Sequence, residues 1–226
     1  MLWLLCSRLF IFALVIASCD VAVAPPPPPP PAAAWTACRE AIAAVELGSG
    51  IPPGLLLAVA LIEAGRAVPG SNRAEPWPWS YNADGNGHEP STQAEAIAEV
   101  SALLAQGIRS IDIGCMQINL KYHPAAFANL KDGFSPIENV RYATRFLLDL
   151  RAAAGSWAEA VARYHSGDPA RGAAYQRRIM LARLGHGLDK DGIIRLPPGA
   201  GAGLCAPGLV PVLVLRGTRP RMMCRR

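Results

Sequence analysis

The sequence predicts a mainly α-helical fold. The chain has 226 residues and is 51% hydrophobic, which is enough apolar material for one sizeable core. Ala/Leu-rich segments with helical periodicity recur along it, whereas the alternation typical of strands is scarce. We therefore expect one helical domain, with a small β-hairpin or loop insert after its second helix.

Residues 1–24 resemble an export signal, because Arg8 precedes an apolar run at 9–17 that is too short for a comfortable membrane span. Seven consecutive prolines follow at 25–31 and predict a polyproline II spacer of about 20 Å, within a linker that extends to residue 33. We expect an exported protein, either periplasmic or anchored to a membrane and facing the periplasm.

The cleavage site has two interpretations. Residues 16–19 resemble a lipobox, in which Cys19 would be lipidated and would tether the protein to a membrane. Residues 22–24 would suit ordinary signal peptidase, but Pro25 is a poor residue after a cut. We favour the lipobox; the alternative is that Cys19 is merely a small residue at the end of the signal.

The folded body is expected over 34–191 and begins with a helix from Ala34 to about Leu47. Proline is acceptable in the first turn of a helix, so residues 51–53 open a second helix over the apolar stretch 54–66. Gly65 then marks its end.

An insert at 67–90 is rich in Pro, Gly, Asn and Trp. Its Asp84-Gly85 and Asn86-Gly87 pairs are turn signals, and the aromatic residues at 77–81 alternate. This pattern favours a small hairpin.

Further helices are predicted at 92–106, 136–153, 157–165 and 170–184. Thr92 and Glu95 have the spacing of half a capping box, and Ser156 and Glu159 repeat it. Ser135 before a proline gives the third of these helices a clear start. Beyond Gly192 the composition turns to Gly, Pro, Leu, Val and Arg without periodicity, so we expect 192–226 to be a poorly ordered tail with no role in the fold.

The net charge of +5 is unevenly distributed. Six of the arginines lie beyond residue 192, where there is no acidic residue, and Arg8 belongs to the signal. Without these seven, 15 basic residues face 17 acidic ones. The body is nearly neutral, which argues against nucleic-acid binding.

Six cysteines suit an oxidising compartment. Within the folded body, Cys38 and Cys115 are candidates for a disulfide worth about 4 kcal/mol in the chain-entropy model; two buried free thiols are the alternative. No spacing of cysteine and histidine resembles a zinc site, and we expect no metal.

Glu63 is an isolated carboxylate near the end of the apolar helix. Burial disfavours its charged form, so it can hold a proton to higher pH and act as a general acid. The alternative is that Glu63 turns outward and meets water or Arg66.

Four segments carry a family resemblance together, and they are 61–66, 113–119, 162–167 and 174–178. Their order and spacing are similar to the soluble lytic transglycosylase (SLT) catalytic domain, a lysozyme-like helical fold related to goose lysozyme that cleaves peptidoglycan. The Gly114-Cys115-Met116-Gln117-Ile118 segment is the most specific part, and the resemblance covers about 34–185.

The resemblance implies roles for the matching positions. Glu63 corresponds to the single catalytic acid, and Met116 and Gln117 match residues lining the sugar subsites. Tyr164 matches the Tyr of an Ala-Tyr-Asn-x-Gly segment, and Tyr175 matches a helix Tyr that faces the catalytic carboxylate.

Asn119 and His165 complete the expected substrate-binding set. His165 stands where the family has Asn, Arg163 replaces a small residue, and Ala64 replaces the usual Ser after the acid, which puts fine substrate contacts in doubt. Structural alternatives remain open: Gln117 and Asn119 can bond backbone in a tight turn.

The aromatic residues have similar alternatives. Tyr164 and Tyr175 can be core residues with a satisfied hydroxyl. Trp77, Trp79 and Tyr81 can stack on sugars or pack the insert against the domain.

The implied reaction needs one carboxylate and no cofactor. Glu63 would protonate the oxygen between N-acetylmuramic acid and N-acetylglucosamine, then take the proton of the muramoyl 6-hydroxyl as a 1,6-anhydro ring closes. A hydrolytic lysozyme would need a second acid. Asp112 is its main candidate, although a turn cap is its simpler role.

A peptidoglycan-binding lipoprotein with a weakened site is a further alternative. The expected partner is the peptidoglycan glycan strand, and we expect a monomer. Cleavage could serve a secretion or flagellar apparatus, but no segment identifies such a partner.

Overall fold

The computed structural model describes residues 32–71, 73–185, 193–195, 205–216 and 219–225. The expected export signal, Cys19 and the proline spacer at 25–31 lie outside the described residues. Within the described ranges, no helix combines the length and the apolar character needed to cross a membrane.

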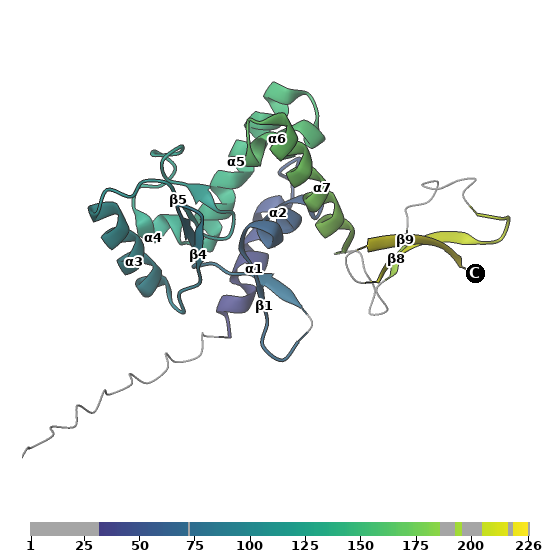
Figure 1. The fold of residues 1–226 in the computed structure, drawn as a ribbon, viewed down its shortest axis with the longest axis horizontal. Coiled ribbons are helices and arrows are strands. Elements are labelled where there is room, and N and C mark those ends of the chain that lie inside the picture. The colour runs from purple at the N-terminus through teal and green to yellow at the C-terminus, as the bar shows by residue number, and fades with distance from the viewer. Residues whose placement is uncertain (1–31, 72, 186–192, 196–204, 217–218, 226) are drawn as a thin grey trace, which may run out of the picture.

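The described residues form a mainly α structure with small antiparallel sheets (Figure 1). The helices are α1 (Ala34–Glu46), α2 (Leu55–Ala64), α3 (Gln93–Ala105), α4 (Leu130–Gly133), α5 (Pro136–Ala154), α6 (Trp157–His165) and α7 (Pro169–Gly185). All predicted helices are present, with most ends within one or two residues; the end of α2 at Ala64 is set by the strand that follows. Only the four-residue α4 was not predicted.

Two small sheets follow α2 in the chain. Strands β1 (Gly65–Ala67) and β2 (Ala74–Pro76) form a hairpin, and a second sheet has the order β4-β3-β5-β6. Its strands are β3 (Tyr81–Ala83), β4 (Asn86–His88), β5 (Ile111–Ile113) and β6 (Ile118–Asn119). The predicted hairpin is β3–β4, whose turn residues Asp84 and Gly85 both have positive φ, 49° and 90°.

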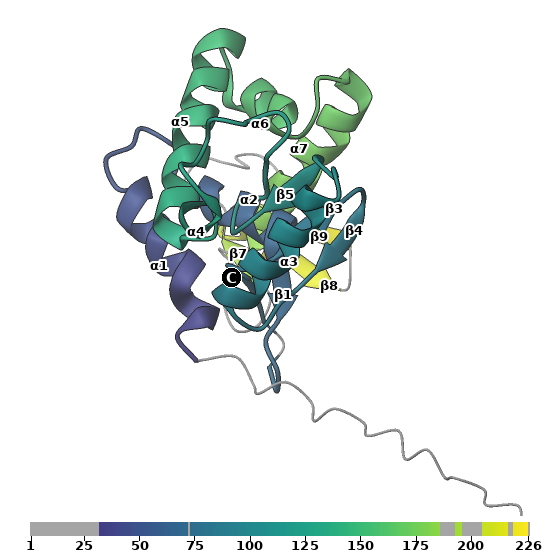
Figure 2. The same cartoon turned by 90° about the vertical axis from the view of Figure 1, so that its left-hand side faces the viewer.

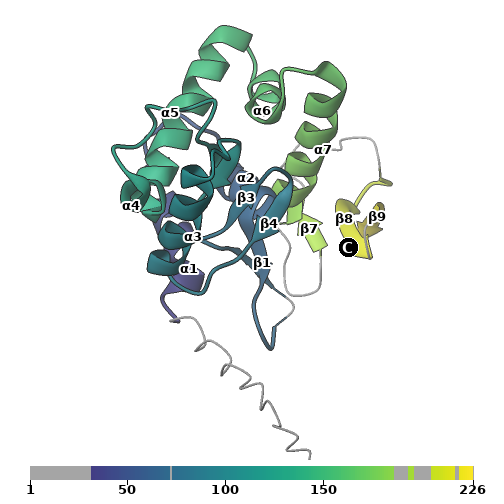
Figure 3. The same ribbon diagram turned by 60° about the vertical axis from the view of Figure 1, so that its left-hand side comes forward.

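The main hydrophobic core surrounds α2. This helix is apolar almost all round, and such a helix is stable only when neighbours cover it. Leu56, Ala58, Val59 and Ala60 are all 0% exposed. Helix α7 packs against α2, and α1 packs against α5. Figure 3 shows α5, α6 and α7 following one another across one end of the domain, with α2 beneath them.

A second hydrophobic cluster joins α3 to the four-stranded sheet. Figure 2 shows α3 beside the strands of this sheet. Ala96 and Val100 of α3 are fully buried with Ile111 and Ile113 of β5. The catalytic candidate Glu63 therefore belongs to the helical side of the domain, whereas Asp112 belongs to the sheet side.

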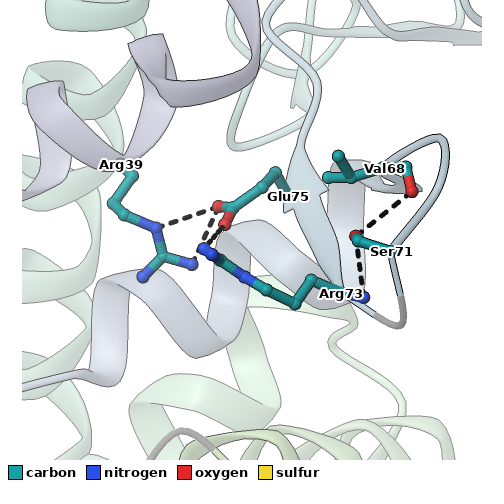
Figure 4. Close-up of polar contacts among 5 residues, drawn as sticks. All are labelled: Arg39, Val68, Ser71, Arg73 and Glu75. Carbon is teal, nitrogen blue, oxygen red and sulfur yellow. Dashed lines mark hydrogen bonds and ion pairs between the residues drawn. The ribbon is translucent and has the colours of Figure 1, made fainter.

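The β1–β2 hairpin is fixed to α1 through a buried carboxylate (Figure 4). Glu75 is 4% exposed; Arg39 Nε donates to its Oε2 at 2.9 Å, and Arg73 Nη2 donates to its Oε1 at 2.6 Å. In the hairpin loop, Ser71 Oγ donates to the carbonyl of Val68 and accepts from the amide of Arg73. Two guanidinium partners supply the compensation that a buried carboxylate requires.

The predicted disulfide is confirmed. Cys38 of α1 and Cys115 are joined at 2.05 Å, with both residues 0% exposed, so the free-thiol alternative is excluded. The bond fixes α1 to the turn between β5 and β6, which carries Gln117.

The C-terminal segment differs from the expectation of poor order. Its described residues form β7 (Ile193–Arg195), β8 (Val210–Arg216) and β9 (Arg219–Arg225), paired antiparallel in that order, and a disulfide joins Cys205 and Cys224. Pro211 and Pro220 lie within these strands and mask the strand signal in the sequence, because proline normally argues against a strand.

Candidate active site

Glu63 lies in the last turn of α2, where two cavities meet. The first, here called the Asp112 cavity, has a volume of about 370 Å³ and is also lined by Asp112, Tyr122, Tyr164 and His165. The second, the His88 cavity, has about 220 Å³ and lies toward β4. Glu63, Asn82 and Gln117 line both, so a ligand longer than one cavity would pass over Glu63.

Burial is the dominant influence on Glu63. It raises the pKa of this carboxyl from 4.5 to about 7, with a smaller raising effect from the charge of Asp112. The hydrogen bond from Tyr175 and the charge of Arg178 act in the opposite direction. Glu63 is therefore able to hold its proton to a much higher pH than an ordinary Glu.

Arg66 is not the partner of Glu63. Its Nε pairs with Glu89 at 3.0 Å, and its guanidinium lies 4.7 Å from the ring centroid of Trp77 and 5.4 Å from that of Trp35. The alternative in which Glu63 turns outward to Arg66 is therefore wrong.

Tyr175 of α7 donates its hydroxyl to Glu63 Oε1 at 2.5 Å. The residue is 2% exposed, and the imidazole of His165 stacks on its ring with centroids 4.5 Å apart and planes 5° from parallel. Burial and the nearby Glu63 carboxylate raise the pKa of Tyr175 well above its ordinary value, so the phenol remains a donor.

The turn between β5 and β6 has a shape that its sequence alone does not explain. Gly114 and Gln117 both have positive φ, 79° and 48°. Asn139 of α5 is fully buried; its Oδ1 accepts from the amide of Met116 at 2.9 Å, and its Nδ2 donates to the carbonyls of Ile113 and Gly133 at 3.0 Å. A Cβ at position 114 would meet Asn139 at 2.5 Å, so only glycine fits there.

Gln117 partly fits both of its interpretations, as a residue that lines a sugar subsite and as a side chain that bonds backbone in a tight turn. Its Nε2 donates to the carbonyls of Ser80 and Gly114, each at 3.0 Å, as the backbone-bonding alternative expects. Its side chain also lines both cavities, and none of the described residues donates to its Oε1. That oxygen is available to accept a hydrogen bond from a ligand.

Met116 does not fit its predicted role as a substrate contact. The residue is 0% exposed and packs in the main core, because this turn directs its apolar side chain inward. Its contribution is through the backbone, since the hydroxyl of Tyr164 donates to the Met116 carbonyl at 2.8 Å. Tyr164 thus lines the Asp112 cavity with its hydroxyl already satisfied.

Asn119 has both ends of its amide engaged within the protein. Its Nδ2 donates to Asp112 Oδ1 at 2.9 Å, and its Oδ1 accepts from the amides of Lys121 and Tyr122. It lines the cavity but acts as a positioning residue, as its structural alternative expects. His165 also lines this cavity.

The aromatic insert packs against the domain. Trp77 is 0% exposed and its Nε1 donates to the carbonyl of Pro90, while Tyr81 is 4% exposed and its hydroxyl donates to Glu99. Trp79 lies edge-on to Trp77 with centroids 5.0 Å apart. Burial excludes Trp77 and Tyr81 as exposed stacking surfaces for a sugar.

The structure adds residues that the sequence analysis did not single out. The sequence offers one indication of Asn139, because a polar side chain there interrupts the buried face of α5. No sequence pattern indicates Tyr122 or His123, since they lie in a loop after β6. Asp112, expected to cap a turn, instead faces the cavity from β5.

A further cavity of about 550 Å³ lies between α6 and α7, away from Glu63. Its lining pair Glu159 and Arg163 bond to each other at 2.8 Å. Because none of the predicted site residues lines this cavity, we do not regard it as the candidate site. In the described part of the chain, no group of three or more His, Cys, Asp or Glu residues is placed to hold a metal ion.

Comparison with known proteins gives no assignment, since no family model, curated protein or solved structure matches the chain. The interpretation of the site therefore depends on its own geometry and on the sequence motifs that compose it.

Proposed function

We propose that this protein is a peptidoglycan lytic transglycosylase with a lysozyme-like (SLT) fold. It would cleave the β-1,4 bond between N-acetylmuramic acid and N-acetylglucosamine and leave 1,6-anhydro-muramoyl ends. The observation that carries the proposal is the Glu63 carboxyl, whose pKa is raised to about 7 where two cavities meet.

In the proposed reaction, Glu63 gives its proton to the glycosidic oxygen as the bond from that oxygen to the muramoyl C1 breaks. The 2-acetamido group of the substrate assists this departure. The Glu63 carboxylate then removes the proton of the muramoyl 6-hydroxyl, and the oxygen of that group forms the new bond to C1. The proton returns to Glu63, so the cycle needs neither water nor a second carboxylate.

A pKa near the working pH suits a residue that is first an acid and then a base. The hydroxyl of Tyr175 stabilises the carboxylate that exists between the two steps, since its hydrogen bond favours the charged form. Gln117 lines both cavities, and since none of the described residues donates to its Oε1, that oxygen can accept a hydrogen bond from a donor group of the sugar.

Hydrolysis by a lysozyme-like mechanism is the second candidate, and one observation favours it. Asp112 lines the same cavity as Glu63, and burial raises the pKa of Asp112. Inverting enzymes of this kind place a water between two carboxyl groups. The products separate the candidates, because anhydro ends are lighter by one water than reducing ends.

The test is mass spectrometry of muropeptides released from purified sacculi. The wild-type protein is expected to release anhydro products, and Glu63→Gln is expected to release none. Glu138→Gln, which changes an exposed carboxylate, is the control and should release as much as wild type. Reducing ends would support hydrolysis, and equal release by Glu63→Gln would exclude both mechanisms. Binding to sacculi without release by the wild type would indicate a binding protein.

We also propose export and a membrane tether at Cys19, which rest on residues 1–24 alone. Metabolic labelling with a fatty-acid analogue tests the tether. Label in the wild type and none in Cys19→Ala is the expected result, whereas an unlabelled wild type would support cleavage after residue 24.

A further inference from the structure

A fixed turn carries Tyr122 at the wall of the Asp112 cavity. Asn119 Oδ1 accepts the amides of Lys121 at 3.0 Å and Tyr122 at 3.2 Å, and the amide of His123 donates to the Asn119 carbonyl at 2.9 Å. Asn119 is held in turn by its bond to Asp112. The backbone conformation around Tyr122 is thus determined by one side chain and the sheet behind it.

His123 fixes the other end of this turn. Its Nδ1 lies 2.8 Å from the hydroxyl of Tyr142, and its ring meets Phe146 edge-on with centroids 4.6 Å apart. Burial lowers the pKa of His123, so the ring is neutral at neutral pH. Because His123 fills the inner position, the adjacent Tyr122 is directed outward.

Tyr122 is 72% exposed and yet lines the cavity that contains Glu63. A single exposed aromatic residue needs no explanation by itself. Here, however, hydrogen bonds to Asn119 hold the backbone that carries the ring, and none of the described residues bonds to its hydroxyl. An aromatic ring on a fixed backbone segment is suited to binding the face of a ligand, because the backbone loses little conformational entropy on binding.

Lys121 adds a charge beside this ring. Its ammonium group lies 5.8 Å from the centroid of the Tyr122 ring, and the residue is exposed. None of the described acidic residues pairs with it. An aromatic face next to an unpaired cation matches a pyranose ring that carries an acidic substituent.

We propose that Tyr122 and Lys121 form a sugar subsite in which the Tyr122 ring stacks on a pyranose and Lys121 binds a carboxylate attached to that sugar. The proposal rests on the glycan-cleaving function and names the sugar preferred on this side of Glu63. Muramic acid has the required chemistry, because its lactyl group carries either a carboxylate or a peptide that ends in one.

Binding to the Glu63→Gln protein tests this subsite without catalysis. The probes are a neutral tetramer of N-acetylglucosamine and an alternating tetrasaccharide with N-acetylmuramic acid, each measured by calorimetry. Adding Tyr122→Ala is expected to weaken both roughly tenfold, as loss of an aromatic anchor does, whereas Tyr122→Phe keeps the affinity. Adding Lys121→Ala should weaken only the acidic tetrasaccharide.

The outcomes separate this proposal from the proposed function. If Glu63→Gln binds the sugars and Tyr122→Ala binds them equally well, the stacking subsite is excluded while the enzyme proposal stands. The carboxylate contact is excluded if Lys121→Ala lowers the affinity for both probes equally. It is also excluded if Lys121→Ala leaves the affinity for the acidic tetrasaccharide unchanged. If Glu63→Gln binds neither probe, both proposals fail; circular dichroism must show native helix content in every variant.

Discussion

The hydroxyl of Tyr175 and the carboxylate of Glu63 are joined by a 2.5 Å hydrogen bond, although the two residues are 112 positions apart. The bond exists because α7 packs along α2 and directs Tyr175 at the last turn of that helix. The imidazole of His165 stacks on one face of the Tyr175 ring. Residues of α2, α6 and α7 therefore surround the proton shared by Glu63 and Tyr175.

Removing that hydroxyl should change the pH dependence of activity. The Tyr175 hydrogen bond lowers the pKa of Glu63, so Tyr175→Phe should raise it. The protonated acid then persists to higher pH, and the alkaline limb of kcat/KM moves upward. We expect kcat to fall on the order of tenfold to a hundredfold, because a hydrogen bond to a charged group is lost. The rate at which the turbidity of sacculi falls, followed from pH 5 to pH 9, measures the pH profile and the loss of activity.

Tyr81→Phe is the matched control, since it also removes a hydroxyl that donates to a carboxylate, Glu99. This variant should keep the wild-type pH profile. An unchanged profile in Tyr175→Phe would contradict the assigned coupling between Tyr175 and Glu63.

The raised pKa of Glu63 also predicts how stability varies with pH. Folded protein binds this proton up to about pH 7, whereas an unfolded Glu releases it near 4.5. Unfolding therefore releases a proton between these values, and the contribution of Glu63 to the free energy of unfolding falls as pH rises through that window. The total loss is on the order of 3 kcal/mol.

Urea unfolding of wild type and Glu63→Gln at pH 4, 6 and 8 measures this linkage. The variant lacks the titrating group, so its stability relative to wild type should grow with pH and level off above pH 7. A constant difference at all three values would show that Glu63 has an ordinary pKa.

The sequence predicted correctly those structural features that are determined by residues close together in the chain. Gly65 and the prolines at 52 and 53 mark the ends of α2, and Thr92 accepts the amide of Glu95 as the predicted cap of α3. The isolated carboxylate in an apolar helix identified Glu63 for the same reason. Ser135 shows the limit of such signals, because α5 begins after it without a side-chain cap bond.

What the sequence could not show depends on contacts between distant segments. Strands of two or three residues, such as β5 and β6, are too short to alternate visibly. The inward direction of Met116 follows from a turn that Asn139 holds from another helix, and the packing of Trp77 follows from neighbours in α1 and the insert. Each of these is determined by tertiary structure and not by local pattern.

Loss of the Cys38–Cys115 disulfide should destabilise the domain and disturb the site. The bond closes a loop with a sequence separation of 77, which corresponds to about 4 kcal/mol in the chain-entropy model. Cys38→Ala with Cys115→Ala should lower the urea midpoint and reduce kcat, because Cys115 directly precedes Met116 and Gln117. Replacing Cys205 and Cys224 instead should leave kcat unchanged; an equal effect of both double variants would contradict a specific role for the first.

Asn139 tests whether the turn between β5 and β6 must be held from α5. Asn139→Leu keeps the branched shape of the side chain but removes three hydrogen bonds in a fully buried position, one from the amide of Met116 and two to the carbonyls of Ile113 and Gly133. We expect a loss of about 2–4 kcal/mol in the free energy of unfolding and a fall in kcat, because Gln117 depends on this turn. Asn129→Ala is the control: it removes the exposed cap of α4, which should cost about 1 kcal/mol without changing kcat. If Asn139→Leu lost stability but kept wild-type kcat, the turn would not need Asn139 to position Gln117, and the site would be more tolerant than its geometry indicates.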